Sequence, residues 1–364
     1  MKNYRLTLKL HGPVHIGSGN TIGKNEFVID QKSRILYIMD MEKMFSALCN
    51  LRFDSDYEKY VLSGGRGLAA FFREHSIFAA EYKKWAVYSF PMPEIDDIRS
   101  FQIQQTIKDA YNLPFIPGSS LKGAIRNCIM CGDLLKKEDS LAHEVYNEKR
   151  DFKNRTGYLR DQSNRLNIRY HTLGRNEKKV NDAVNSVFQD LVIGDSSPLS
   201  LDDLTICQKI DLAPDNTENR LNIYRECLRP GTIISFEIGI GSNFPYGIDD
   251  IISAIDSTYK RNNEVFLSKF PKEPTPSGHL MYLGGGTGFV SKTVIYSLIH
   301  DNKKALETAS VILDKVDSMN RGKKVGDHLN DPREYNVSPH MRKQTSYNGN
   351  YYDFGLCSVD IKEL

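Results

Sequence analysis

Two glycine-rich segments, each running into a lysine, place the strongest limits on the backbone of this chain. Residues 117–126 read PGSSLKGAIR, and residues 284–293 read GGGTGFVSKT. Glycine tolerates positive φ and close backbone approach, so successive N–H groups in such a segment can point at one anion. A helix that begins directly afterwards adds its N-terminal dipole. The two segments therefore predict two phosphate-binding loops and a ligand that carries several phosphates.

The elements expected around these segments are both strands and helices. Residues 4–10 alternate apolar side chains with basic or polar ones, which is the pattern of a strand with one buried face. Further strands are expected at 27–30, 34–39, 234–240 and 356–361, and further helices near 41–50, 56–74, 248–259 and 305–316. The chain thus opens with a strand, a hairpin and helices, and a second compact half follows.

A helix is also expected directly after Gly118, with Ser119 or Ser120 as its N-cap. Lys122 and Arg126 would share one face of this helix. Like charges four residues apart repel by a few tenths of a kcal/mol, so an anion lying between them would explain the pair. A solvated helix face is the alternative.

The composition bounds the size and the charge of the protein. A chain of 364 residues with 40% hydrophobic content can bury a full core, as two lobes or as one heavily elaborated domain. The net charge is only +2, so affinity for nucleic acid must come from local clusters. Residues 149–179 hold ten basic against three acidic side chains, an excess of seven. We interpret residues 136–190 as an exposed basic insertion or long loop, whose Tyr158, Tyr170 and His171 could stack on bases.

Cysteine usage and hydropathy indicate an intracellular protein. No apolar run approaches the roughly 20 residues needed to span a bilayer, so we expect a cytoplasmic chain with no membrane partner. Six scattered cysteines do not resemble a disulfide framework and are expected to be reduced. Cys128 and Cys131 have metal-ligand spacing without a second pair, so buried thiols are favoured and no metal or cofactor is expected.

The second glycine-rich segment nearly matches a nucleotide-binding P-loop. If Gly286 is taken as the first glycine, Lys292 and Thr293 fall in place, but Ser291 stands where the second glycine is required. No parallel α/β sheet is evident around the segment. Three hypotheses follow: contact with a nucleic-acid backbone, which we favour, a tight structural turn, and binding of a nucleoside triphosphate.

His15 lies in the segment 12–19, GPVHIGSG, beside flexible backbone that follows the first strand. An imidazole exchanges protons near neutral pH, so His15 could be a general base that activates a ribose 2′-hydroxyl. A metal-independent endoribonuclease acting on repeat RNA is therefore an alternative function. A lone histidine is more often structural, and the spacing identifies no second acid or base.

Together, residues 12–19, 115–126 and 283–293 resemble the RAMP superfamily of CRISPR proteins. Further blocks narrow the resemblance to the fifth-subunit family of type III-A Csm complexes: residues 194–196, 207–211, 223–228, 338–343 and 355–357. The resemblance implies an α+β fold with a ferredoxin-like, RRM-type core and large insertions.

The same resemblance suggests a division of the chain. We expect an N-terminal RAMP core at 1–135, the basic insertion at 136–190 and a C-terminal half with its glycine-rich loop at 191–364. That half either forms a second, degenerate RRM-like unit or joins the first in one composite domain.

The resemblance implies a non-catalytic subunit that caps the 3′ end of the CRISPR RNA (crRNA) and supports its maturation and complex assembly in antiviral defence. The implied partners are crRNA, the repeated Csm backbone subunit, the small Csm subunit and host nucleases that trim the crRNA, with target RNA contacted indirectly. The resemblance assigns no catalytic residue to this sequence. The residues expected to bind RNA are His15, Gly17, Ser18, Gly118, Ser119, Ser120, Lys122, Arg126, Arg155, Arg160, Arg165, Gly284, Gly285, Gly286, Thr287, Gly288, Lys292, Arg342 and Lys343.

Overall fold

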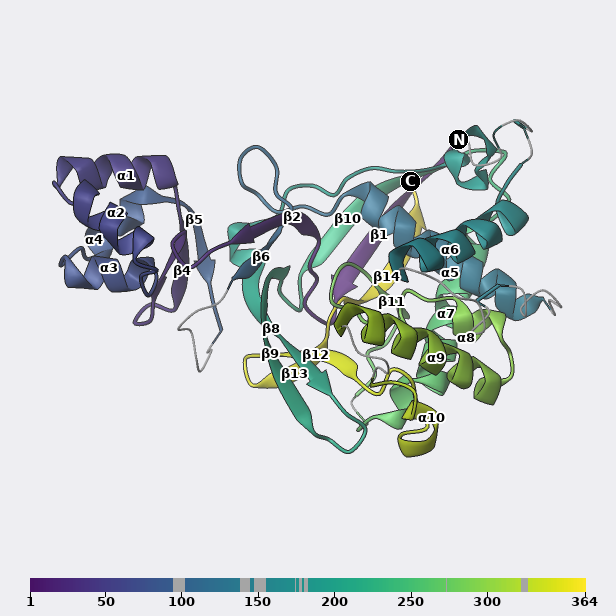
Figure 1. Cartoon of the computed structure of the whole chain (residues 1–364). Coiled ribbons are helices and arrows are strands. Elements are labelled where there is room, and N and C mark those ends of the chain that lie inside the picture. The colour runs from purple at the N-terminus through teal and green to yellow at the C-terminus, as the bar shows by residue number, and fades with distance from the viewer. Residues whose placement is uncertain are drawn as a thin grey trace.

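The structure is a computed structural model. It describes residues 1–93, 102–137, 145–146, 155–173, 175–176, 179, 183–272, 274–321 and 327–364. The described strands form three sheets, while helices α1–α4 lie at one end of the molecule and α5–α10 at the other (Figure 1). The expected α+β class is confirmed. None of the helices in these ranges has both the length and the apolar composition needed to cross a membrane.

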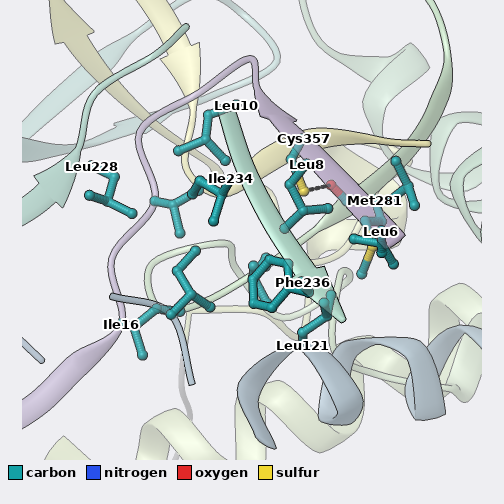
Figure 2. Close-up of a cluster of buried hydrophobic side chains, with 14 of the residues drawn as sticks. Leu6, Leu8, Leu10, Ile16, Leu121, Leu228, Ile234, Phe236, Met281 and Cys357 are labelled. Atoms are coloured by element: carbon teal, nitrogen blue, oxygen red, sulfur yellow. Dashed lines mark hydrogen bonds between the residues drawn. The ribbon is translucent and has the colours of Figure 1, made fainter. Parts of the chain in front are cut away.

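The core sheet is built around the N-terminal strand. Its order is β11 (His279–Tyr282), β14 (Leu356–Glu363), β1 (Lys2–Leu10), β10 (Ile233–Ile240) and β7 (Leu191–Ile193). β1 pairs antiparallel with β10 on one side and with β14 on the other. The alternation of its sequence is confirmed, since Leu6, Leu8 and Leu10 are at most 1% exposed. Figure 2 shows them clustered with Leu121 and Phe236.

Two helices complete this core: α5 (Gly118–Lys136) and α7 (Ile248–Val265). Their buried faces join the same apolar cluster as the core sheet. Along the chain the elements run β1, α5, β7, β10, α7, β11, which is the order of a β-α-β-β-α-β unit. In space, β14 is inserted between β1 and β11.

A second sheet lies beside the core. Its order is β13 (Asn350–Asp353), β12 (Arg342–Tyr347), β8 (Leu204–Leu212), β9 (Glu218–Leu228), β6 (Ile103–Thr106) and β2 (Gly17–Ile22). In both sheets, strands from the first 135 residues pair directly with strands beyond residue 190, as β1 does with β10 and β6 with β9. The early and late parts of the chain thus share their sheets.

A small three-stranded unit projects from the body at the left of Figure 1. It contains β3 (Phe27–Asp30), β4 (Ile35–Met39), β5 (Ala86–Pro91), α1 (Met41–Asn50), α2 (Asp54–Leu62), α3 (Leu68–Glu74) and α4 (Ala79–Tyr82). The expected hairpin and first helix are confirmed. The helical stretch expected at 56–74 is interrupted, because Gly64 and Gly67 have φ of 75° and 105°, which a right-handed helix excludes.

The remaining helices flank α5 and α7. They are α6 (Arg155–Tyr170), α8 (Ile295–Leu298), α9 (Asn302–Arg321) and α10 (Asp331–Glu334). The expectation of an exposed loop is wrong over the residues of α6. Tyr158 and Leu166 are buried in a second apolar cluster, and His171 is only 2% exposed. Tyr158 and His171 therefore cannot stack on bases in this arrangement.

Candidate nucleic-acid interface

A groove of about 470 Å³ opens where three segments distant in sequence meet. His15 lines it from the loop before β2, Ser120 and Asn127 line it from α5, and the glycine-rich segment after β11 lines it with Gly284, Gly285, Ser291 and Lys292. The side-chain amide of Asn127 donates to the carbonyl oxygen of Ser291 at 3.4 Å, although these residues lie 164 positions apart. The two glycine and lysine segments therefore flank one groove.

The glycine-rich loop is held against the His15 loop by its backbone. Alternate glycines from Gly284 to Gly288 have φ of 86–87°, and a Cβ at Gly284 would lie 2.4 Å from the carbonyl oxygen of His15. The N–H of Gly285 donates to that same oxygen at 2.7 Å. The N–H groups of residues 286–288 have no acceptor in the described part of the chain. Those three amides remain able to bind an anion.

The loop does not have the architecture of a P-loop. The hydroxyl of Ser291 donates to the carbonyl oxygens of Thr287 and Gly288 at 3.0 and 3.2 Å, which closes the turn on itself. The next helix, α8, begins only at Ile295 and has four residues. A P-loop instead leads directly into a long helix whose N-terminus binds phosphate. The geometry therefore does not support binding of a nucleoside triphosphate.

A carboxylate of the protein already binds the N-terminus of α5. The helix begins at Gly118 with Pro117 as N-cap, so the expectation of a Ser119 or Ser120 cap is wrong. The N–H of Gly118 donates to Oδ1 of Asp195 at 2.8 Å. A carboxylate thus holds the position predicted for phosphate. Gly118 is buried, whereas Ser119 is exposed and Ser120 lines the groove.

Gly118→Ala is expected to lower the free energy of unfolding by about 1–3 kcal/mol, because its Cβ would overpack the site. That Cβ would lie 2.2 Å from the carbonyl oxygen of Ile193 and 2.5 Å from that of Gly194. Gly123→Ala on the same helix is the matched control, since no atom lies within 4 Å of its Cβ. Chemical denaturation of both variants tests this, and equal stabilities would contradict it.

His15 is buried in the wall of the groove with a fixed tautomer. It is 5% exposed, and its Nδ1 lies 2.7 Å from the carbonyl oxygen of Glu226. A carbonyl only accepts, so Nδ1 donates and Nε2 carries the lone pair. Burial, together with the nearby cations of Arg225 and Lys108, lowers the pKa of His15 to about 4. A base this weak drives proton abstraction poorly near neutral pH, so the endoribonuclease hypothesis loses its support.

A pH titration of stability is expected to report the neutral state of His15. Between about pH 6.5 and pH 4 the unfolded chain protonates this imidazole while the folded chain does not. Folding stability must therefore fall as the pH falls through this window, by about 1.4 kcal/mol per pH unit. His15→Gln removes this contribution. Denaturation curves of both proteins at several pH values measure the difference, and parallel pH profiles would refute the assignment.

A buried ion pair that the sequence analysis missed lies beneath His15. Glu226 on β9 is fully buried, and its Oε2 lies 2.5 Å from Nζ of Lys108. The hydroxyl of Tyr88 donates to Oε1 at 2.7 Å, and the N–H of Thr106 donates to Oε2 at 3.0 Å. Each of these polar groups has a hydrogen-bond or ion-pair partner. The network therefore fixes the position of Glu226, whose carbonyl oxygen accepts the hydrogen bond from His15.

The predicted cations of the two glycine and lysine segments have no carboxylate partner in the described part of the chain: Lys122, Arg126 and Lys292. Lys292 lines the groove, and partial burial together with the nearby Arg225 lowers its pKa. Lys122 and Arg126 lie on another face of α5, because helical residues follow one another at about 100°. The guanidinium of Arg126 lies 4.9 Å from the ring centre of Phe188. Of these three cations only Lys292 lines the groove, whereas Lys122 and Arg126 lie on another face of α5.

Two predicted cations near the C-terminus are committed to ion pairs. Arg342 is 8% exposed and binds Asp353 through Nε at 2.7 Å and Nη2 at 3.0 Å. The hydroxyl of Tyr282 donates to the same carboxylate at 2.8 Å. Lys343 lies 2.8 Å from Oδ1 of Asp211. We therefore leave Arg342 and Lys343, like the buried Gly118, out of the candidate surface.

The other predicted residues fall in two places. Gly17 and Ser18 are exposed at the start of β2, and Gly17 lines the groove. Arg155 begins α6, and Arg160 and Arg165 are exposed on that helix. Neither Arg160 nor Arg165 lines the groove.

The paired cysteines of α5 belong to its buried face. Cys128 and Cys131 are 7% and 2% exposed, which confirms the prediction of buried thiols. Burial raises the pKa of Cys131 to about 11. Both groups therefore remain protonated near neutral pH.

The fold and the site define an α+β protein in which a helix and a glycine-rich loop enclose a groove that Lys292 lines. A family model described as the RAMP superfamily matches residues 7–291. The chain belongs to the RAMP superfamily.

More specific similarities point to one kind of CRISPR protein. The chain is 26% identical to the CRISPR system Cms protein Csm5 of Mycobacterium tuberculosis strain H37Rv, with 100% of this chain and 98% of that protein covered. It is 25% identical to the Csm5 of Streptococcus thermophilus over 80% of each chain.

Two solved structures share the fold. One is a chain of a cryo-EM structure of a Csm–crRNA–target RNA ternary complex of a type III-A CRISPR–Cas system, with a TM-score of 0.66, 21% identity and coverage of 98% of this chain and 100% of that one. The other is the crystal structure of T. onnurineus Csm5, with a TM-score of 0.63, 19% identity and coverage of 97% and 99%.

Proposed function

We propose that this chain is the crRNA-binding, Csm5-type subunit of a type III-A Csm complex and that it holds the 3′ portion of the crRNA. The observation that carries the proposal is the convergence of the His15 loop, α5 and the glycine-rich loop on one groove. The full-length similarity to proteins named Csm5 supports the assignment to this complex.

The groove offers groups that suit a sugar-phosphate backbone. The ammonium of Lys292 can bind a phosphate oxygen, and Nε2 of His15 can accept a hydrogen bond from a ribose hydroxyl. Beside the groove, the N–H groups of residues 286–288 offer further donors to phosphate. Such contacts carry no base information. A subunit that serves guides with many different spacers requires this indifference to sequence.

Capping of the crRNA 3′ end would involve neighbouring proteins as well as the RNA. We propose the repeated Csm backbone subunit and the small Csm subunit as direct partners and host trimming nucleases as transient ones, with target RNA contacted indirectly. The chain would act without catalysing RNA cleavage. The pKa of His15, lowered to about 4 by burial, supports a binding role in preference to general-base catalysis.

Co-purification tests this function. The tagged chain, co-expressed with the other Csm subunits and a CRISPR array, is expected to retain these proteins and crRNA with a discrete set of 3′ ends. Two arrays with unrelated spacers should load to within about threefold of each other, because backbone contacts are sequence-independent. Absence of crRNA, or recovery of only one spacer, would overturn the proposal.

A further inference from the structure

A cluster of two histidines and one aspartate lies outside the groove, between α9 and β12. Nδ1 of His328 lies 3.0 Å from Oδ2 of Asp331, and Nδ1 of His340 lies 2.6 Å from Oδ1 of the same carboxylate. The ligand atoms of all three residues lie within 4.8 Å of one another. Three potential metal ligands, two from residues 328–331 and one from residue 340, therefore converge on one point.

The chemistry of the cluster suits a zinc ion. Asp331 is 1% exposed, and each of its two carboxylate oxygens lies next to Nδ1 of one of the histidines. Two imidazole nitrogens and a carboxylate are ligands that Zn²⁺ favours, with a fourth position left for water.

The surrounding residues orient these ligands. The hydroxyl of Ser338 donates to Oδ2 of Asp331 at 2.8 Å, and the ring of Tyr335 stacks on His340 at 4.9 Å. Asp314 on α9 accepts a hydrogen bond from the backbone N–H of His328 at 3.3 Å through its carboxylate. Metal ligands typically have such supporting contacts, which fix their orientation.

We propose that His328, Asp331 and His340 form a zinc-binding site that fastens the segment after α9 to the start of β12. The side chains of the two histidines are 18% and 13% exposed, so an ion can reach them from solvent while the aspartate lies beneath. On binding, each neutral imidazole carries its proton on Nε2 and gives the lone pair of Nδ1 to the metal. The site is independent of the proposed RNA groove.

Metal analysis of the full-length chain tests this proposal. After removal of any histidine tag, the wild-type protein is expected to contain about one zinc per chain, and Asp331→Asn and His340→Ala to lose at least tenfold of it. His279→Ala is the matched control, because His279 pairs with Asp256 in an exposed pair with no third ligand. Zinc content that falls equally in the control would show adventitious binding and refute the site.

A second measurement does not depend on the folding of the variants. Wild-type protein stripped with a chelator is expected to regain about 5 °C in Tm with Zn²⁺ at about 100 times its Kd and little with Mg²⁺. Co²⁺ added to the stripped protein should give the visible absorption of a tetrahedral site. A wild-type chain without zinc, whose Tm responds to neither chelator nor Zn²⁺, would mean that the cluster is only a hydrogen-bonded network.

Discussion

Glu226→Ala is expected to lower the free energy of unfolding by about 3–5 kcal/mol, because it leaves the buried ammonium of Lys108 without its carboxylate partner. The side chain of Lys108 is 5% exposed and that of Glu226 is fully buried. The same change removes the acceptor of the Tyr88 hydroxyl and of the Thr106 amide. Urea denaturation followed by circular dichroism measures the loss.

Two companion variants show whether the ion pair is the cause. Glu237→Ala, at an exposed position of β10, should change stability by less than about 0.5 kcal/mol. Joint replacement of Glu226 and Lys108 by methionine should recover most of the lost stability, since it removes both charges from the interior. A loss below about 1 kcal/mol for Glu226→Ala would contradict the arrangement described for this network.

Charge reversal of Lys122, Arg126 and Lys292 is expected to deplete and shorten the crRNA that co-purifies with the complex. A hydrogen bond to a charged group contributes about 1.5 kcal/mol, which is roughly tenfold in affinity for each cation. The structure separates the three, so Lys292→Glu should weaken contact inside the groove, and Lys122→Glu with Arg126→Glu should weaken contact along α5. Sequencing of the bound RNA from each variant reports both effects.

Lys59→Glu provides the control for this experiment, because Lys59 is exposed on α2 of the small unit. It changes the net charge of the chain as Lys292→Glu does, but away from the groove. Melting curves should accompany the RNA analysis, since Arg126 also packs on Phe188. Unchanged amount and length of crRNA in the folded triple variant would count decisively against the proposed interface.

The strands of the core were predictable where one face is apolar and the other polar. β1 and β10 alternate over most of their length, and Leu6, Leu8, Leu10, Ile234, Phe236 and Ile238 are buried as the period requires. α6 was not predictable in this way, because only scattered positions such as Tyr158 and Leu166 face the interior. The small unit was missed as a unit because its aromatic core comes from short helices separated by glycine turns.

The candidate site was predicted in outline and not in detail. The glycine and lysine segments identified both walls of the groove, because glycine content and a following lysine are local properties. The partners of these segments are not local: Asp195 reaches Gly118 across 77 positions, and Glu226 reaches His15 across 211. Glu226 lies between Arg225 and Cys227 on a strand, and a glutamate is ordinarily expected at the surface.

The place of β14 in the core sheet has a consequence for biosynthesis. β1 is synthesised well before β14, so the edge of β1 that pairs with β14 stays open until residues 356–363 arrive. At about 5–20 residues per second, this delay lasts tens of seconds. During that time an apolar strand edge is exposed to other nascent chains. Yield in cells should therefore depend on chaperones that shield the growing chain and on translation speed.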